Sequence, residues 1–252
     1  MPWEAIEVGS IITEAFAIER IPPISDEKVL VVAGGKSPSD AWLKTISRQF
    51  DVWVADKGIQ CCRNIDVVPV AIVGDGDSSS LEDWDWAAER GAKIYRYPKD
   101  KDYTDLQLTL MQIGNIYRSP SVFVTAGLGG RLDHTLSNVF SLIWAQRWGV
   151  DTLGFIGEDE SFILLKDKER LTVHFDEKPF ALSLLSLTPR SDGVSLKGVK
   201  WELEDVSLKL EEPFAVSNEL RKEERDVYLS IKSGCVGVYI CLSEKRLKKA
   251  GF

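Results

Sequence analysis

Between residues 28 and 150, short apolar runs rich in β-branched residues alternate with stretches of helical periodicity, and this alternation constrains the fold more than any other feature. Runs of four to five apolar residues indicate strands buried on both faces, and strands separated by helices form parallel sheets. The runs are VLVVAGG, DVWVADKG, VVPVAIVGDGD, AKIYRYPKDKD and SVFVTAGLGG. The sequence therefore predicts an α/β domain with a parallel sheet over residues 28–152.

Beyond residue 151 the pattern changes to short segments in which apolar and polar residues alternate, with turn residues between the segments. These segments are ESFILLKD, RLTVHFDE, FALSLLSLTP, VSLKGVKWELED and VYLSIKSGCVGVYICLS. Regular short strands without helical spacers predict an all-β domain, an antiparallel β-sandwich over residues 153–252. Residues 1–27 form an N-terminal extension, with a short helix expected at residues 5–19 that packs against the first domain or a partner subunit.

Size and charge limit the classes of partner. A chain of 252 residues suits two domains, and its net charge of -8 argues against nucleic acid as a partner. No segment approaches the roughly 20 apolar residues of a membrane span, and the N-terminus lacks a signal-peptide pattern. We expect a cytoplasmic protein whose four cysteines are reduced.

Every apolar run of the first domain ends in glycine, aspartate or lysine, and these ends should converge at one edge of the sheet. Asp75 and Asp77 follow the third run and are two residues apart, so on an extended segment their carboxylates face the same spot. Two anions this close repel each other unless a cation lies between them, and Mg²⁺ prefers such oxygen ligands. The alternative is a plain turn that leads into the next helix.

A second acidic cluster follows the fourth run. Asp100, Asp102 and Asp105 lie here together with Lys99 and Lys101, so carboxylates and phosphate-binding cations could face the first cluster across a crevice. A solvated loop is the alternative.

The helices of the first domain have readable N-termini. Thr104 and Gln107 have the spacing of a capping box, which places Asp105 in the first turn of a helix with one apolar stripe. Asp133 is the expected N-cap of the next helix, whose buried stripe would include Leu136 and Phe140.

The glycine-rich turn TAGLGGRLDH is a candidate phosphate site. Gly129 and Gly130 leave backbone amides free ahead of a helix N-terminus, and Arg131 adds a guanidinium suited to phosphate oxygens. The spacing fits neither the P-loop nor the GxGxxG motif. His134 is either a catalytic base or a residue that bonds locally.

Taken in order, these segments resemble the thiamine pyrophosphokinase family. The resemblance spans residues 31–219 and rests on VVAGG, VADKG, GDGDS, DKDYTD, GGRLDH, KGVKWEL and VSNE. It implies a homodimeric enzyme with a Rossmann-like domain and a β-sandwich, and active sites between subunits. It also implies transfer of pyrophosphate from ATP to the hydroxyl group of thiamine with Mg²⁺, releasing AMP.

The resemblance also implies roles for individual residues, carried over motif by motif. The implied catalytic residues are Asp75, Asp77, Asp102 and Asp105, of which Asp75, Asp77 and Asp105 hold the metal. The implied ATP-binding residues are Lys101, Thr104, Gly129, Gly130, Arg131 and Asp133, and the implied thiamine-binding residues are Trp201, Ser217 and Asn218. For Trp201 the alternative is a tryptophan of the sandwich core.

Three positions depart from the family pattern, namely Gly76 between the two aspartates, Lys57 in place of a glycine, and Gln107 in place of an acid. Two other functions stay open at this point. One is a phosphatase of the haloacid dehalogenase type, with Asp75 as the nucleophile and Asp77 as acid and base. The other is a nucleotide- or thiamine-binding module without catalytic activity.

Overall fold

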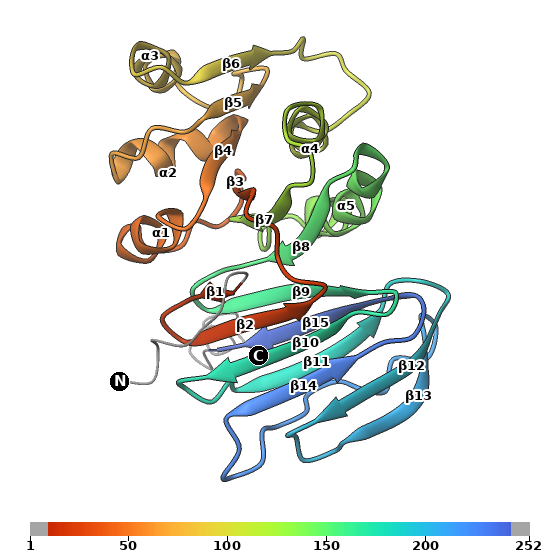
Figure 1. The fold of residues 1–252 in the computed structure, drawn as a ribbon. Helices are drawn as coiled ribbons and strands as arrows, with labels where there is room; N and C mark the ends of the chain where they lie inside the picture. Colours follow the sequence, from red (N-terminus) through yellow and green to blue (C-terminus); the bar gives the residue numbers. More distant parts are fainter. Residues whose placement is uncertain (1–9, 243–252) are drawn as a thin grey trace. The chain divides into compact units, whose positions relative to one another are not determined.

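The computed structural model describes residues 10–242 and divides the chain into two compact units (Figure 1). The parallel unit comprises residues 25–157, and the antiparallel unit joins the N-terminal residues up to 24 to the chain from residue 158 onwards. Both units have the predicted class, whereas the predicted limits, residues 28–152 and 153–252, stay a prediction. No helix in the described part is long and apolar enough to span a membrane.

The parallel unit is built on six parallel strands, in the spatial order β8-β7-β3-β4-β5-β6. The strands are β3 (Lys28–Val32), β4 (Asp51–Ala55), β5 (Ala71–Gly74), β6 (Lys93–Arg96), β7 (Ser121–Thr125) and β8 (Asp151–Phe155). Every residue of β5 and β7 is buried, as the continuous apolar runs predict. The prediction is wrong for β6, which lies at the edge of the sheet and is largely exposed.

The chain builds the sheet outwards from β3 to β6 and then returns to the other side of β3 with β7. This reversal opens a crevice at the carboxyl ends of β3 and β7, where open α/β sheets bind ligands. In Figure 1, α1–α3 lie on one side of the sheet and α4 and α5 on the other. The helices are α1 (Asp40–Ser47), η1 (Asp56–Gly58), α2 (Ile59–Asn64), α3 (Leu81–Glu89), α4 (Asp105–Ile116), α5 (Leu132–Trp144) and η2 (Ala145–Trp148).

The antiparallel unit contains two sets of antiparallel strands. One set has the order β1-β2-β10-β14-β12-β13, and the other has β15 between β11 and β9. The strands are β1 (Ile11–Ile12), β2 (Phe16–Ile21), β9 (Glu160–Lys166), β10 (Arg170–Phe175), β11 (Ala181–Ser186), β12 (Arg190–Lys197), β13 (Leu203–Lys209), β14 (Asp226–Ser230) and β15 (Cys235–Cys241). Burial alternates along β10 and β11, which is the pattern of strands with one face in a core.

The prediction of a helix at residues 5–19 is wrong for residues 10–19, which contain no helix. Residues 1–9 lie outside the described residues. Phe16–Ile21 forms strand β2, which pairs with β10, so this segment belongs to the antiparallel unit. Buried Arg20 forms an ion pair with Glu169, close to the start of β10. A short apolar run fits a helix or a strand equally well, and a distant partner strand decided the outcome.

Helix α5 also differs from its prediction. Leu136 and Phe140 are 47% and 58% exposed, although the sequence predicted that they would be buried. The buried residues of the helix are Ser141 and Leu142, and Thr152 of β8 donates a 2.7 Å hydrogen bond to the Leu142 carbonyl oxygen. The small side chain of Ser141 lets the helix approach the strand closely, so the side with Ser141 and Leu142 is buried while Leu136 and Phe140 face outwards.

Candidate active site

Three carboxylates meet at the ends of two neighbouring strands. Asp56 follows β4, Asp75 and Asp77 follow β5, and one oxygen from each lies within 4.8 Å of the other two. Asp75 and Asp77 therefore face one spot, as their spacing predicts, and Asp56 joins them. This donor set is of the kind that binds a hard divalent cation.

The backbone and the hydrogen bonds around Asp56 hold its carboxylate in place. The residue has a φ of 39°, in the left-handed region that non-glycine residues rarely adopt. Its Oδ1 accepts hydrogen bonds from the Gly76 amide at 3.0 Å and from Ser79 Oγ at 3.4 Å. Its Oδ2 is buried and has no hydrogen-bond partner among the described residues. A buried carboxylate oxygen without a partner is costly, so the group fits a metal site.

Asp77 lies at the exposed side of the three carboxylates. Lys99 Nζ is 2.7 Å from its Oδ2, and Ser78 donates a hydrogen bond of 2.9 Å to its Oδ1. The hydrogen bonds from Lys99 and Ser78 lower the pKa of Asp77 to about 2. Asp77 is therefore ionised at neutral pH.

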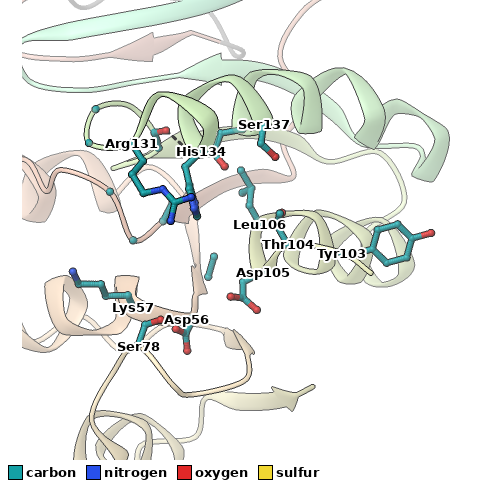
Figure 2. A pocket seen from close by; sticks show the side chains of 18 of the residues that line it. Asp56, Lys57, Ser78, Tyr103, Thr104, Asp105, Leu106, Arg131, His134 and Ser137 are labelled. Atoms are coloured by element: carbon teal, nitrogen blue, oxygen red, sulfur yellow. Dashed lines mark hydrogen bonds between the residues drawn. The ribbon is translucent and has the colours of Figure 1, made fainter. Parts of the chain in front are cut away.

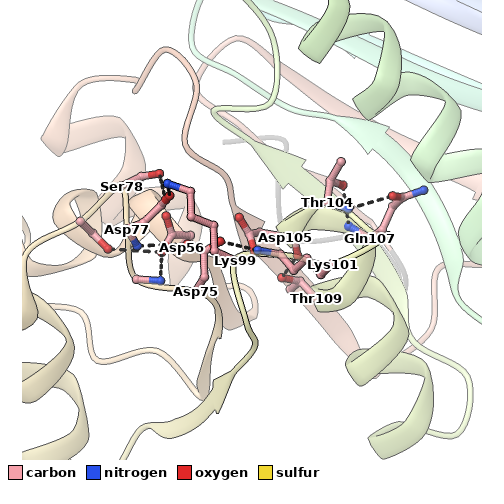
Figure 3. A network of polar contacts seen from close by, with 12 residues as sticks. Asp56, Asp75, Asp77, Ser78, Lys99, Lys101, Thr104, Asp105, Gln107 and Thr109 are labelled. Carbon is pink, nitrogen blue, oxygen red and sulfur yellow. Dashed lines mark hydrogen bonds and ion pairs between the residues drawn. The ribbon is translucent and has the colours of Figure 1, made fainter.

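Lys101 connects the two acidic clusters (Figure 3). Its ammonium donates to Asp75 Oδ2 and lies 3.2 Å from Asp105 Oδ1. Burial alone would lower the pKa of Lys101, but its hydrogen bonds to these two carboxylates outweigh burial and raise it. Burial raises the pKa of Asp105, and Lys101 opposes this shift. The structure thus brings together the acid clusters that the sequence expected to meet across the crevice.

Helix α4 begins with the predicted capping box. Gln107 N–H donates to Thr104 Oγ1 at 3.2 Å, and the Thr104 amide donates to Gln107 Oε1 at 3.0 Å. This box fixes Asp105 in the first turn, at the wall of the crevice. Asp102 is exposed and lies outside the set of residues that line the pocket.

A pocket of about 580 Å³ opens at the carboxyl ends of β3, β4 and β7 (Figure 2). Glycines form much of its wall, and the turns after β3 and β7 touch through a 2.7 Å hydrogen bond from the Gly35 amide to the Ala126 carbonyl oxygen. A Cβ atom on Gly35 would lie 2.4 Å from that oxygen, so only glycine fits. The pocket is lined by Ala33, Gly34, Gly35, Ala55, Asp56, Lys57, Ser78, Lys99, Lys101, Tyr103, Thr104, Asp105, Leu106, Gly127, Gly129, Gly130, Arg131, His134, Ser137 and Asn138.

Arg131 is the N-cap residue of α5, and the prediction that Asp133 takes this position is wrong. Asp133 instead accepts hydrogen bonds from the Arg131 guanidinium at 3.1 and 2.5 Å, which lower the pKa of Asp133 to about 2. Arg131 and His134 line the pocket with Gly129 and Gly130, whereas Asp133 does not. Asp133 therefore contacts the pocket wall through two of its residues, the Arg131 guanidinium and the His134 amide, which donates to Asp133 Oδ1 at 3.0 Å.

Trp201, Ser217 and Asn218 come together in the antiparallel unit. Asn218 is buried, and its side chain accepts from the Trp201 amide at 3.2 Å and donates to the Trp201 carbonyl oxygen at 2.7 Å. The Trp201 side chain is 53% exposed, so the alternative that it belongs to the core is wrong. Lys200 Nζ lies 4.4 Å from the ring centroid, so the ring already accommodates a cation.

Two family models match this chain. The model described as thiamin pyrophosphokinase, catalytic domain, matches residues 43–152, and that described as thiamin pyrophosphokinase, vitamin B1 binding domain, matches residues 170–236. The chain belongs to the thiamin pyrophosphokinase family.

Individual members of the thiamin pyrophosphokinase family are similar to this chain over most of their length. The thiamine pyrophosphokinase of Bacillus subtilis is 24% identical over 192 residues, 75% of this chain and 88% of the relative. The thiamin pyrophosphokinase 1 of Caenorhabditis elegans is 25% identical over 183 residues, 67% of this chain and 68% of the relative. The crystal structure of the Bacillus subtilis protein has the same fold, with a TM-score of 0.72 and 21% identity over 86% of this chain and 99% of that chain.

Asp56, Asp75 and Asp77 together form what we call the acidic group. The sequence interpretation missed Asp56 as a member of it. The thiamin pyrophosphokinase catalytic-domain match includes Asp56 as well as Asp75 and Asp77. A signal was present, because Asp56 directly follows a buried run just as Asp75 does, and neighbouring parallel strands bring their carboxyl ends together.

Proposed function

We propose that this chain transfers the pyrophosphoryl group of ATP to the hydroxyl group of thiamine. The thiamine oxygen forms a bond to the β-phosphorus, the bond between that phosphorus and the α–β bridging oxygen breaks, and AMP leaves. The hydroxyl proton is released, so the products are thiamine diphosphate, AMP and a proton.

The observation that carries this proposal is the group of Asp56, Asp75 and Asp77 beside a pocket with glycine-rich walls. The buried Asp56 Oδ2 without a partner and the two acids beside it fit Mg²⁺, which takes few carboxylates and fills its other positions with water and phosphate oxygens. When bound, Mg²⁺ neutralises charge that develops on the transferred phosphates. We assign the metal to Asp56, Asp75 and Asp77. Asp105, which the family resemblance implied as a ligand, is not among the residues that we assign to the metal.

The remaining pocket residues suit a nucleotide. Gly129 and Gly130 both have a φ near 80°, which leaves their amides free to face phosphate oxygens, and Arg131 lines the same wall. Lys101 and Thr104 also line the pocket, next to Asp105 of the second acidic cluster. These groups supply the positioning and charge neutralisation on which phosphoryl transfers depend.

Asp105 is the residue that we propose to accept the hydroxyl proton. Asp105 lines the pocket, whereas Asp102 does not. Asp77 forms an ion pair with Lys99 and belongs to the acidic group that we assign to the metal. Lys101 holds the Asp105 carboxylate in place through the 3.2 Å contact. A base must reach the proton that it accepts, which favours the residue at the pocket wall.

We assign thiamine to the stretch around Trp201, Ser217 and Asn218. An exposed tryptophan ring suits the flat, positively charged thiazolium by stacking and cation–π attraction, and the Asn218 side chain fixes the backbone that carries the ring. This stretch falls within the match to the vitamin B1 binding domain.

We propose that the active form is a homodimer in the cytoplasm. Leu132, Leu136 and Phe140 form an exposed apolar stripe one helical turn apart on α5, and such stripes are normally covered by a partner. Light scattering should give twice the chain mass, and Phe140→Asp should shift the population to monomer. The four free cysteines agree with a reducing compartment.

The test of the reaction is to incubate the protein with ATP and Mg²⁺, with and without thiamine. AMP and thiamine diphosphate should form in equal amounts, and only when thiamine is present. Release of phosphate from small phosphoesters without thiamine would instead indicate the phosphatase, and binding without turnover would indicate the non-catalytic module. The comparisons give no support to either alternative.

A further inference from the structure

We propose that Lys57 binds the β- and γ-phosphates of the nucleotide and makes the pocket select ATP over AMP. This inference rests on the proposed function, because it names the residue that recognises the transferred group. Lys57 lies in the turn η1 (Asp56–Gly58), directly after Asp56, and lines the pocket.

The other cations of the pocket are already paired within the chain. Lys99 contacts Asp77, Lys101 contacts Asp75 and Asp105, and Arg131 contacts Asp133. Within residues 10–242, Lys57 is the pocket cation for which the structure records no hydrogen bond or ion pair. A nucleotide triphosphate brings several negative charges into a site that already holds four carboxylates, so an ammonium free to pair with it is needed.

The backbone of Lys57 is tightly constrained. A Cβ atom on Gly58 would lie 2.1 Å from the Val32 carbonyl oxygen, and one on Gly74 would lie 2.7 Å from Asp56 Cβ. The turn therefore packs closely against the ends of β3 and β5, with no room for a further methyl group at either glycine. This packing places the backbone of Lys57 directly beside Asp56.

The aliphatic part of Lys57 lies over Gly34 in the turn after β3. An ideal Cβ on Gly34 would be 3.0 Å from Lys57 Cβ and 3.8 Å from its Cγ and Cδ. In the view of Figure 2, Lys57 lies on the side of Asp56 and Ser78, across the pocket from Arg131 and His134. Lys57 therefore shares that side of the pocket with Asp56, one of the carboxylates that we assign to the metal, and a metal held there would draw the β- and γ-phosphates of ATP to the same side.

Lys57→Met tests the charge while it keeps most of the aliphatic stem, and Lys57→Arg restores a cation. Lys44→Met is the matched control, because Lys44 is an exposed lysine of α1 in the same unit and does not line the pocket. Calorimetry measures the binding of ATP and of AMP in Mg²⁺ without thiamine, and circular dichroism checks the fold of each variant.

Lys57→Met should weaken ATP binding by at least about tenfold, the range for hydrogen bonds to charged groups, and change AMP binding less than about twofold. Lys57→Arg should keep most of the ATP affinity, and Lys44→Met should keep all of it. Unchanged ATP binding in Lys57→Met, or an equal loss for AMP, would overturn the assignment. Because binding is measured without turnover, this outcome is separate from the thiamine-dependent AMP assay, whose failure alone would overturn the proposed function.

Discussion

Asp56 Oδ1 accepts a 3.0 Å hydrogen bond from the backbone amide of Gly76, which ties the end of β4 to the turn between Asp75 and Asp77. Gly76 has a φ of 76°, a conformation that suits glycine, and this conformation directs its amide at Asp56. Gly76 is thus part of the geometry that brings the three carboxylates together. We expect the acidic group to be preorganised through this bond.

Asp56→Asn tests whether the three carboxylates form a metal site. The amide oxygen can still accept from Gly76, but one negative charge within 4.8 Å of two others is removed. Without Mg²⁺ the variant should be more stable by roughly 1 kcal/mol or more, since repulsion is relieved. Addition of Mg²⁺ should raise the melting temperature of the native protein and raise that of the variant far less.

Asp85→Asn is the control for Asp56→Asn, because Asp85 is an exposed acid of α3 outside the pocket. It should respond to Mg²⁺ as the native protein does. An equal Mg²⁺ response in Asp56→Asn would remove Asp56 from the metal site.

Thr104→Ala tests the capping box at the start of α4. Loss of the Thr104 side chain removes the cap on the Gln107 amide and should lower the free energy of unfolding by about 1 kcal/mol. Thr104→Ser keeps the hydroxyl and should restore most of this stability. Urea unfolding checks both variants, and the account of the cap fails if the two are equally destabilised.

Tyr117 makes stability sensitive to alkaline pH. Burial raises its pKa to about 12; the hydrogen bond from Trp53 opposes the shift, and the nearby Asp51 carboxylate adds to it. In the unfolded chain the pKa is about 10, so between pH 10 and 12 the unfolded chain loses the proton first and stability falls as pH rises. Below pH 10 both states are protonated and the contribution is complete.

Tyr117→Phe should abolish this part of the alkaline loss. Urea unfolding at pH 9 and pH 11 should show a smaller decrease for the variant than for the native protein. The same decrease in both proteins would mean that Tyr117 does not cause it.

Trp201→Ala tests the thiamine assignment in the antiparallel unit. Removal of the exposed ring should raise the KM for thiamine roughly tenfold and leave the KM for ATP unchanged. Tyr228→Ala is the matched control, since Tyr228 is an exposed aromatic residue of β14 in the same unit. An unchanged KM for thiamine in Trp201→Ala, or a rise of similar size in both variants, contradicts the assignment.

Local patterns were the part of the fold that the sequence predicted well. The buried runs of β5 and β7, the capping box at Thr104 and the common direction of Asp75 and Asp77 depend on neighbouring residues, so periodicity and spacing reveal them. The convergence of the acidic clusters was also predictable, because parallel strands carry their carboxyl ends to one edge.

The errors have a different physical origin. Strand β2 depends on pairing with β10, roughly 150 residues further along the chain, and no local pattern contains that partner. The orientation of α5 depends on the close approach of β8, which favours Ser141 over the larger Phe140 on the buried side. For Asp56 the end of a buried run was a readable signal, but its unusual φ and its bond to Gly76, which set the direction of the carboxylate, are seen only in the folded chain.

The most direct measurement is the rate of thiamine-dependent AMP release from ATP and Mg²⁺ by the native protein and by Asp75→Asn and Asp77→Asn. Both substitutions remove a carboxylate from the acidic group. We predict that each variant loses about a hundredfold or more in turnover and keeps the native fold by circular dichroism. Turnover that is unchanged in both folded variants would contradict the claim that these carboxylates carry the reaction.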